Sequence, residues 1–134
     1  MRLARLAALL VVAATLLACK PAFDIRLASG EEQLPNPRFI VTERDDPNRR
    51  PRYHTVRVLD AETEALVWHL RATPFGDTAS QANLQYGVTP EGFAAMIAAE
   101  SLKPGRKYVL VVSGTAHGQL RFEVTAEGRV VAKE

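Results

Sequence analysis

From residue 37 onward the chain repeats short segments in which apolar and polar residues alternate. A period of two places every second side chain on the same face of a strand, so these segments predict half-buried antiparallel strands. Clusters of Gly, Pro, Asp or Asn separate them, as turn residues do. The six strands predicted in this way are RFIVTE, RYHTVRVLD, ALVWHLRA, RKYVLVVSG, GQLRFEVTA and GRVVAK.

The second and third of these segments also predict how they pair. Val56 and Val58 share one face of their strand, and Leu66, Trp68 and Leu70 share one face of theirs. Directly opposed residues of an antiparallel pair lie on the same side of the sheet. A common core therefore requires Val58 opposite Trp68 and Val56 opposite Leu70. The connection is then the five residues AETEA, or a shorter turn with a β-bulge.

Two stretches depart from the alternating pattern. Residues 19–36 have the composition of a tether, although Phe23, Ile25 and Leu27 alternate and would suit a first edge strand. The stretch TPEGFAAMIAAESL, which starts at residue 89, has a proline where a first helical residue would be and apolar residues at helical spacing. We expect a short helix near residues 90–100, or an irregular connector.

The motif LKPGRKYVLVV is the most specific indication of fold. Its Leu-x-Pro-Gly-x-x-Tyr spacing resembles the turn before strand F of fibronectin type III domains. There a tyrosine hydroxyl bonds back to the upstream backbone, the tyrosine corner of immunoglobulin-like sandwiches. The resemblance implies that Leu102 plugs the core, that Pro104 and Gly105 shape the turn, and that Tyr108 enters the strand. Trp68 is then expected at the centre of the core.

These patterns together predict an all-β fold. We expect an antiparallel immunoglobulin-like (fibronectin III-like) β-sandwich of about seven strands, which spans residues 37–134 as one domain. Helix-rich folds fit the pattern poorly.

The first eighteen residues have a different character. Arg2 and Arg5 precede an apolar run from Leu6 to Ala18. As a helix this run would measure ~20 Å, whereas a bilayer core is about 30 Å thick. A basic start, an apolar run and small final residues are the layout of a cleaved signal peptide, here residues 1–18.

The end of that segment, Leu16-Leu17-Ala18-Cys19, resembles the lipobox of bacterial lipoproteins. The resemblance implies cleavage after Ala18, then a diacylglycerol and an N-acyl chain on Cys19, and we expect no other cofactor. Two or three acyl chains anchor a protein firmly where one chain anchors it marginally. Lys20 stands where an Asp resembles an inner-membrane retention signal, which implies the outer membrane, facing the periplasm. The alternative is an ordinary signal peptide followed by an unmodified cysteine.

Cleavage changes the charge of the chain. The whole sequence has 17 Lys and Arg against 15 Asp and Glu, and removal of Arg2 and Arg5 leaves 15 against 15. A mature chain without net charge has no overall field that would attract nucleic acid, so no nucleic-acid partner is expected. With Cys19 acylated, the domain must also fold without a disulfide.

The sequence contains no recognisable catalytic or metal-binding motif. His54, His69 and His117 are not spaced as ligand pairs with one another or with Cys, Asp or Glu. The nucleophile motifs G-x-S-x-G and S-x-x-K are also missing. We therefore expect a protein that is not an enzyme and has no metal site.

Two connectors are candidate binding segments. TPFGDTASQANLQYG, residues 73–87, holds Phe75, Gln81 and Tyr86 in a long polar loop, as recognition surfaces do. The alternative is that its aromatic residues pin the loop to the sandwich. ERDDPNRRPRYH, residues 43–54, carries four arginines, which suit the phosphates of lipid heads or cell-wall polymers; the alternative is a mobile surface loop.

The sequence thus predicts a membrane-anchored envelope lipoprotein that acts as a non-catalytic binding or structural module. Its partner would be an envelope protein or a cell-wall glycan. The alternative is a small periplasmic enzyme or metal carrier, which would require the three histidines to converge with a carboxylate in one pocket. A secretion-system accessory lipoprotein is a weaker alternative.

Overall fold

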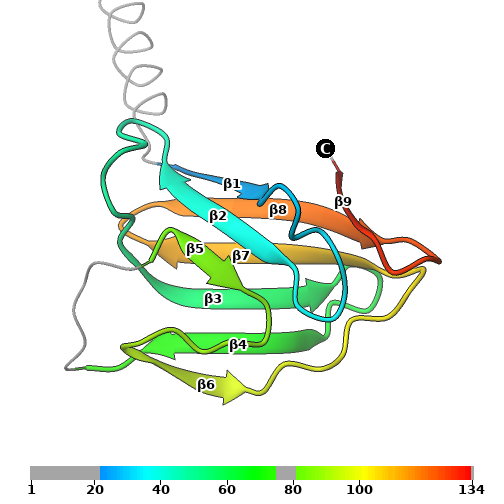
Figure 1. Cartoon of the computed structure of the whole chain (residues 1–134). Coiled ribbons are helices and arrows are strands. Elements are labelled where there is room, and N and C mark those ends of the chain that lie inside the picture. Colours follow the sequence, from blue (N-terminus) through cyan, green and yellow to red (C-terminus); the bar gives the residue numbers. More distant parts are fainter. Residues whose placement is uncertain (1–21, 75–80, 134) are drawn as a thin grey trace, which may run out of the picture.

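The computed structural model describes residues 22–74 and 81–133. The regular secondary structure within these residues consists of β-strands, with no helix. The strands form two antiparallel sheets, ordered β1-β2-β5 and β6-β4-β3-β7-β8-β9, which pack as the two layers of a sandwich (Figure 1). This confirms the predicted all-β sandwich. The strands are β1 (Phe23–Leu27), β2 (Arg38–Glu43), β3 (Tyr53–Asp60), β4 (Leu66–Ala72), β5 (Asn83–Gln85), β6 (Phe93–Ile97), β7 (Lys107–Gly114), β8 (His117–Val124) and β9 (Val130–Lys133).

The pairing of β3 with β4 follows the predicted register. Val58 lies opposite Trp68, and Val56 lies opposite Leu70. The register then shifts, so that Leu59 rather than Asp60 lies opposite Leu66. The connection is therefore the shorter turn with a bulge. Leu66 was expected on the core face with Trp68 and Leu70, but the bulge places it opposite the outward-facing Leu59, and Val67 is buried instead.

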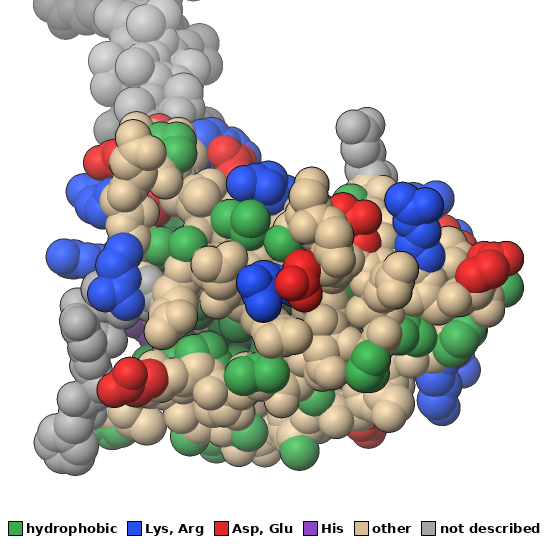
Figure 2. Space-filling model, in the orientation of Figure 1, with side chains coloured by type: hydrophobic (Ala, Val, Ile, Leu, Met, Phe, Trp, Pro, Cys, Tyr) green, Lys and Arg blue, Asp and Glu red, His purple; other side chains and the backbone are tan. Residues whose placement is uncertain are grey.

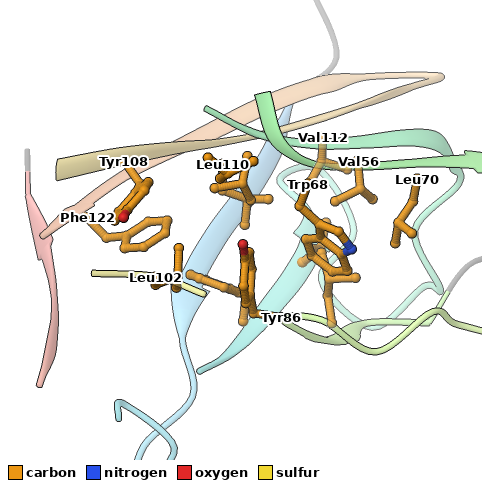
Figure 3. Packing of buried hydrophobic residues seen from close by; sticks show 14 of the residues in the cluster. Val56, Trp68, Leu70, Tyr86, Leu102, Tyr108, Leu110, Val112 and Phe122 are labelled. Carbon is orange, nitrogen blue, oxygen red and sulfur yellow. The ribbon is translucent and has the colours of Figure 1, made fainter. Parts of the chain in front are cut away.

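The core lies between the sheets and contains the apolar rows of both. Trp68 is the largest of its fully buried side chains, with 1% of its surface exposed. Its ring centroid lies 5.0 Å from that of Tyr86, with the rings inclined at 61° (Figure 3). Phe39 and Val41 of the smaller sheet are fully buried in the same cluster. Trp68 is thus the centre of the core, as expected.

Residues 22–36 belong to the sandwich. Phe23 is 2% exposed, and β1 pairs along its whole length with β2, from Phe23 opposite Glu43 to Leu27 opposite Phe39. The prediction of a tether is therefore wrong for residues 22–36, and the edge-strand alternative is right. Burial of alternate apolar side chains outweighs the polar composition of the segment.

The helix expected near residues 90–100 is wrong, because this stretch contains β6. Phe93 lies opposite Ala72, and Ile97 lies opposite His69, so β6 pairs with β4 and extends the larger sheet. Met96, one of the apolar residues at helical spacing, is 55% exposed. Pairing satisfies the backbone groups at the edge of β4, which a helix would leave open.

The number of strands is also larger than predicted. The described residues contain nine strands where about seven were expected. The two that sequence reasoning missed are β5 and β6, of three and five residues. β5 has only three residues, and β6, whose sequence is FAAMI, is apolar throughout, so neither shows an alternation of apolar and polar residues.

The tyrosine corner is present at the start of β7. The backbone N–H of Lys103 donates a hydrogen bond to the Tyr108 hydroxyl oxygen at 2.9 Å. Leu102 is 5% exposed and belongs to the core cluster. Gly105 has φ of 81°, a left-handed conformation that glycine adopts without strain. The motif therefore shapes this turn in the way the resemblance implied.

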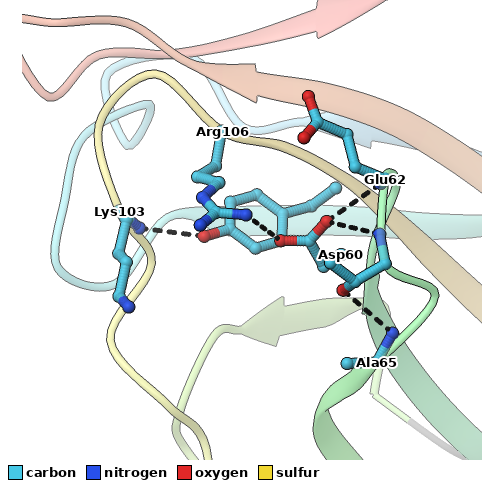
Figure 4. A network of polar contacts seen from close by, with 7 residues as sticks. Asp60, Glu62, Ala65, Lys103 and Arg106 are labelled. Atoms are coloured by element: carbon cyan, nitrogen blue, oxygen red, sulfur yellow. Dashed lines mark hydrogen bonds and ion pairs between the residues drawn. The ribbon is translucent and has the colours of Figure 1, made fainter.

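The carboxylate of Asp60 makes a second set of polar contacts beside the tyrosine corner (Figure 4). One of its carboxylate oxygens accepts the N–H groups of Glu62 and Thr63, at 2.9 and 3.1 Å. The other lies 3.2 Å from a guanidinium nitrogen of Arg106. The backbone amides, that of Thr63 above all, hold the pKa of Asp60 below its usual value. This buried carboxylate therefore organises the β3–β4 turn.

Replacement of Tyr108 with phenylalanine is expected to lower the free energy of unfolding by about 0.5–1.5 kcal/mol, because it leaves the Lys103 amide without its acceptor. Denaturant unfolding measures the change. Lys103→Ala is the matched control, since it removes the side chain and keeps the amide that donates. If Tyr108→Phe unfolds at the same denaturant concentration as the unmodified protein, the hydroxyl does not stabilise the corner.

Candidate binding surface

The outer face of the six-stranded sheet, which points away from the smaller sheet, is the most distinctive surface of the domain. On β3 the buried Val56 and Val58 point into the sandwich, so Arg57 between them points outward. The same alternation places a basic residue outward on each of the neighbouring strands. We define the cationic face as Arg57, His69, Arg71, Lys107, Arg121 and Lys133.

Strand pairing brings these residues together from distant parts of the chain. Arg57 lies opposite His69 on β4 and opposite Val111 on β7. Farther along the sheet, Arg121 lies between Val109 on β7 and Lys133 on β9. The sheet therefore presents basic side chains in rows across its width.

Most of the cations on this face lack an acidic partner. In the described part of the chain, Arg57, Arg71, Lys107 and Arg121 have no carboxylate within ion-pair distance, whereas Lys133 pairs with Glu123 at 3.3 Å. The opposite side of the sandwich, over the smaller sheet, mixes both signs of charge (Figure 2). There Arg44 pairs with Asp24 at 3.0 Å and Arg38 with Glu31 at 3.6 Å, whereas Arg26 has no ion-pair partner among the described residues. The cationic face is thus electrostatically complementary to an anionic partner.

Arg57 occupies the middle of the cationic face. Its side chain is half-buried, and its buried Nε atom has no hydrogen-bond acceptor among the described residues. An unsatisfied buried donor costs about 1–3 kcal/mol. The hydrogen-bonding capacity of this guanidinium is therefore not used up within the described fold.

The pKa of His69 is affected by burial and by neighbouring positive charge. Burial lowers the pKa of its imidazole, and the guanidinium groups of Arg57 and Arg71 lower it further. The neutral form of His69 is therefore favoured in the free protein. An anion bound beside it would oppose the effect of the two arginines and raise this pKa.

Apolar side chains lie between the cations. Leu59, Val109 and Val111 are half-buried at outward positions of β3 and β7. Toward one end of the face, a hollow of about 290 Å³ is lined by Ala61, Lys107, Tyr108, Arg121, Phe122, Glu123 and Lys133. The surface therefore combines unpaired positive charge with apolar area.

In the loop predicted to bind a partner, residues 73–87, Tyr86 has a structural role instead. Tyr86 is 2% exposed, and its hydroxyl donates a hydrogen bond to the carbonyl oxygen of Glu100 at 2.6 Å. Burial raises the pKa of this hydroxyl. Gln81 is exposed, and its carbonyl oxygen accepts a hydrogen bond from the Tyr53 hydroxyl at 2.7 Å. Tyr86 is thus a core residue that pins the segment, while Phe75 lies outside the described residues.

The histidines do not converge. His54 lies on β3, His69 on β4 and His117 at the start of β8, and the hollows identified on the described surface include none of them. The described residues contain no group of three or more His, Cys, Asp or Glu side chains that could hold a metal ion. Among those residues there is also no helix with the length and apolar character needed to cross a membrane.

Sequence reasoning did not single out the cationic face, although it carries a faint signal. Arg57 and Arg121 each stand between two core residues of an alternating strand, which marks them as outward-facing. What alternation cannot show is that β3, β4, β7 and β8 lie side by side. Comparison of the chain with protein-family models, with curated proteins and with solved structures found no match.

Proposed function

We propose that the protein is a lipoprotein of the bacterial cell envelope whose sandwich is a non-catalytic binding module. In this proposal acyl chains on Cys19 hold the domain at the outer membrane, facing the periplasm. The cationic face then binds an acidic surface of another envelope protein. The observation that carries the proposal is that Arg57, Arg71, Lys107 and Arg121 have no ion-pair partner among the described residues, while Glu123, which lies opposite Lys107, pairs with Lys133.

The composition of the face favours a protein over a cell-wall glycan. Half-buried apolar side chains such as Val109 and Val111 separate the cations, and a partner gains affinity from them only if it brings apolar area of its own. Arginines such as Arg57 and Arg71 suit carboxylates, which they bind through two parallel hydrogen bonds. An acidic protein surface supplies both kinds of group.

The arrangement of the ionisable residues favours binding over catalysis. General acid–base chemistry needs groups held in different environments within one cleft. None of the three histidines lines a hollow identified on the described surface, and the Asp60 carboxylate is bound by two backbone amides and Arg106. These contacts support a structural role for Asp60.

Photo-crosslinking in intact envelopes tests the proposal. A photoreactive residue in place of Val111, on the cationic face, is expected to give a protein adduct, whereas one in place of Thr42, on the smaller sheet, is not. Arg57→Gln combined with Arg71→Gln should reduce the adduct at least tenfold, because it removes two of the unpaired charges. Arg26→Gln, an exposed arginine of β1, is the matched control and should leave the yield unchanged.

The result also separates the two classes of partner. The adduct should be digested by protease and should contain an acidic protein. An adduct that resists protease and is released by a cell-wall hydrolase would replace the protein partner with a glycan. Equal yields at Val111 and Thr42 would contradict a role for the cationic face.

A further inference from the structure

We infer that the end of the sandwich at Ala22 rests on the headgroup layer of the membrane that holds the acyl chains of Cys19. This inference depends on the proposed lipid anchor and adds an orientation to it. We call this end the anchored pole, defined by Ala22, the β2–β3 connection (residues 44–52) and the β7–β8 turn (Thr115 and Ala116).

The connection between the anchor and the domain is short. The described part of the chain begins at Ala22, which forms a β-bridge with His117 and whose carbonyl oxygen accepts the Arg44 N–H at 3.0 Å. Lys20 and Pro21 are the residues between Cys19 and Ala22. Three Cα–Cα steps reach at most ~11 Å, so a lipidated Cys19 keeps Ala22 within that distance of the headgroups.

Contacts around Ala22 hold the rest of the anchored pole beside it. A hollow of about 220 Å³ is lined by Ala22, Glu43, Asp45, Arg49, Thr115 and Ala116. The Thr115 N–H also donates to the carbonyl oxygen of Arg52 at 3.2 Å, which ties the β7–β8 turn to the β2–β3 connection. These contacts keep the segments beside Ala22, so they are the part of the domain that the short connection holds nearest the membrane.

The chemistry of the anchored pole suits phosphate headgroups. The side chains of Arg44 and Arg49 are 63% and 60% exposed, although each pairs with an acid, Asp24 and Glu43 respectively. Arginine has five N–H donors, so a guanidinium in an ion pair keeps donors for a phosphate. Asp45 and Asp46 offset the charge of the loop. The short connection, rather than net charge, is therefore what places this pole on the membrane.

The orientation also places the opposite end of the domain away from the lipid. From Tyr53 at the anchored pole, β3 runs eight residues to Asp60. A strand of that length measures about 23 Å. The β8–β9 turn, which contains Glu127, lies at the same far end as Asp60 because β8 runs from His117 to Val124 away from the anchored pole. The cationic face lies along the side of the strands and stays open to a partner.

Fluorescence quenching measures this orientation directly. The sequence has one cysteine, and acylation of Cys19 would consume it, so an introduced cysteine provides a unique labelling site. The lipidated chain with Asp46→Cys or Glu127→Cys is labelled with a fluorophore. It is then reconstituted in vesicles of phosphatidylethanolamine and phosphatidylglycerol that contain a headgroup-linked quencher. We expect quenching at Asp46→Cys to be at least threefold stronger than at Glu127→Cys.

A longer connection provides the second variant. Insertion of ten Gly and Ser residues between Pro21 and Ala22 should reduce quenching at Asp46→Cys to the level of Glu127→Cys. Equal quenching at the two sites without the insertion, or no effect of the insertion, would overturn the inference. Flotation of the vesicles distinguishes a wrong orientation from a missing anchor. Protein that does not float with the vesicles contradicts the lipid anchor. Protein that floats but shows equal quenching at the two sites contradicts only the orientation.

Discussion

Replacement of Trp68 with alanine is expected to lower the free energy of unfolding by about 3–5 kcal/mol. Trp68 is 1% exposed, lies opposite Val58 and packs against Tyr86 at the centre of the core. Removal of the indole loses buried apolar area and leaves a cavity that the paired strands on either side cannot collapse to fill. Denaturant unfolding followed by circular dichroism measures the loss.

Two further variants keep this prediction testable. A domain of this size has a total stability of roughly 5–15 kcal/mol, so Trp68→Ala could unfold the protein completely. Trp68→Phe retains an aromatic ring and is expected to lose less and remain folded. Met96→Ala is the surface control, because Met96 is 55% exposed, and should change stability by no more than about 0.5 kcal/mol. A loss below about 1 kcal/mol for Trp68→Ala would contradict the central position of the indole.

Replacement of Cys19 with serine is expected to abolish attachment to the membrane. A serine hydroxyl cannot form the thioether to diacylglycerol that the lipobox resemblance implies. Each buried lipid methylene contributes ~0.8 kcal/mol, so loss of the chains removes the dominant binding energy. Fractionation of envelopes should move the protein to the soluble fraction, or should show the precursor with residues 1–18 still attached.

Lys20→Ala is the matched control for this substitution, since it changes the next residue and leaves the four lipobox positions intact. It should remain in the membrane fraction. Intact-mass measurement of the unmodified protein should show a mature chain that starts at Cys19 and carries the mass of its acyl groups. A mature chain with a free thiol would contradict the anchor, as would undiminished attachment of Cys19→Ser.

The sequence by itself determined the pairing of the main core residues of β3 and β4 and the turn before β7. Val56, Val58, Trp68 and Leu70 could be paired correctly because antiparallel register follows from which residues must share a buried face. The tyrosine corner at Tyr108 was predicted from the resemblance of its motif to fibronectin type III domains, and the hydroxyl and the Lys103 amide that it joins are five residues apart in the chain. In both cases the interactions that decide the structure are encoded within one or two neighbouring segments.

Only the tertiary structure decided that the segments of β1, β5 and β6 form strands. β1, β5 and β6 have three to five residues each, and their sequences also suit a tether, a loop or a helix. What makes them strands is the set of unsatisfied backbone groups on β2 and β4, to which they pair. Their partners lie elsewhere in the chain, so periodicity within the segment left a strand as an alternative for β1 and did not predict β5 or β6.

The candidate binding surface depends on tertiary structure in the same way. Arg57, Arg71 and Arg121 are separated by 14 and 50 residues along the chain, and each looks in isolation like an ordinary outward side chain. Strand order places them on one face, where the outward-facing Glu123 is already paired with Lys133. Alternation determines which way a side chain points, whereas sheet topology determines which side chains become neighbours. That is why the sequence specified the inside of this domain better than its surface.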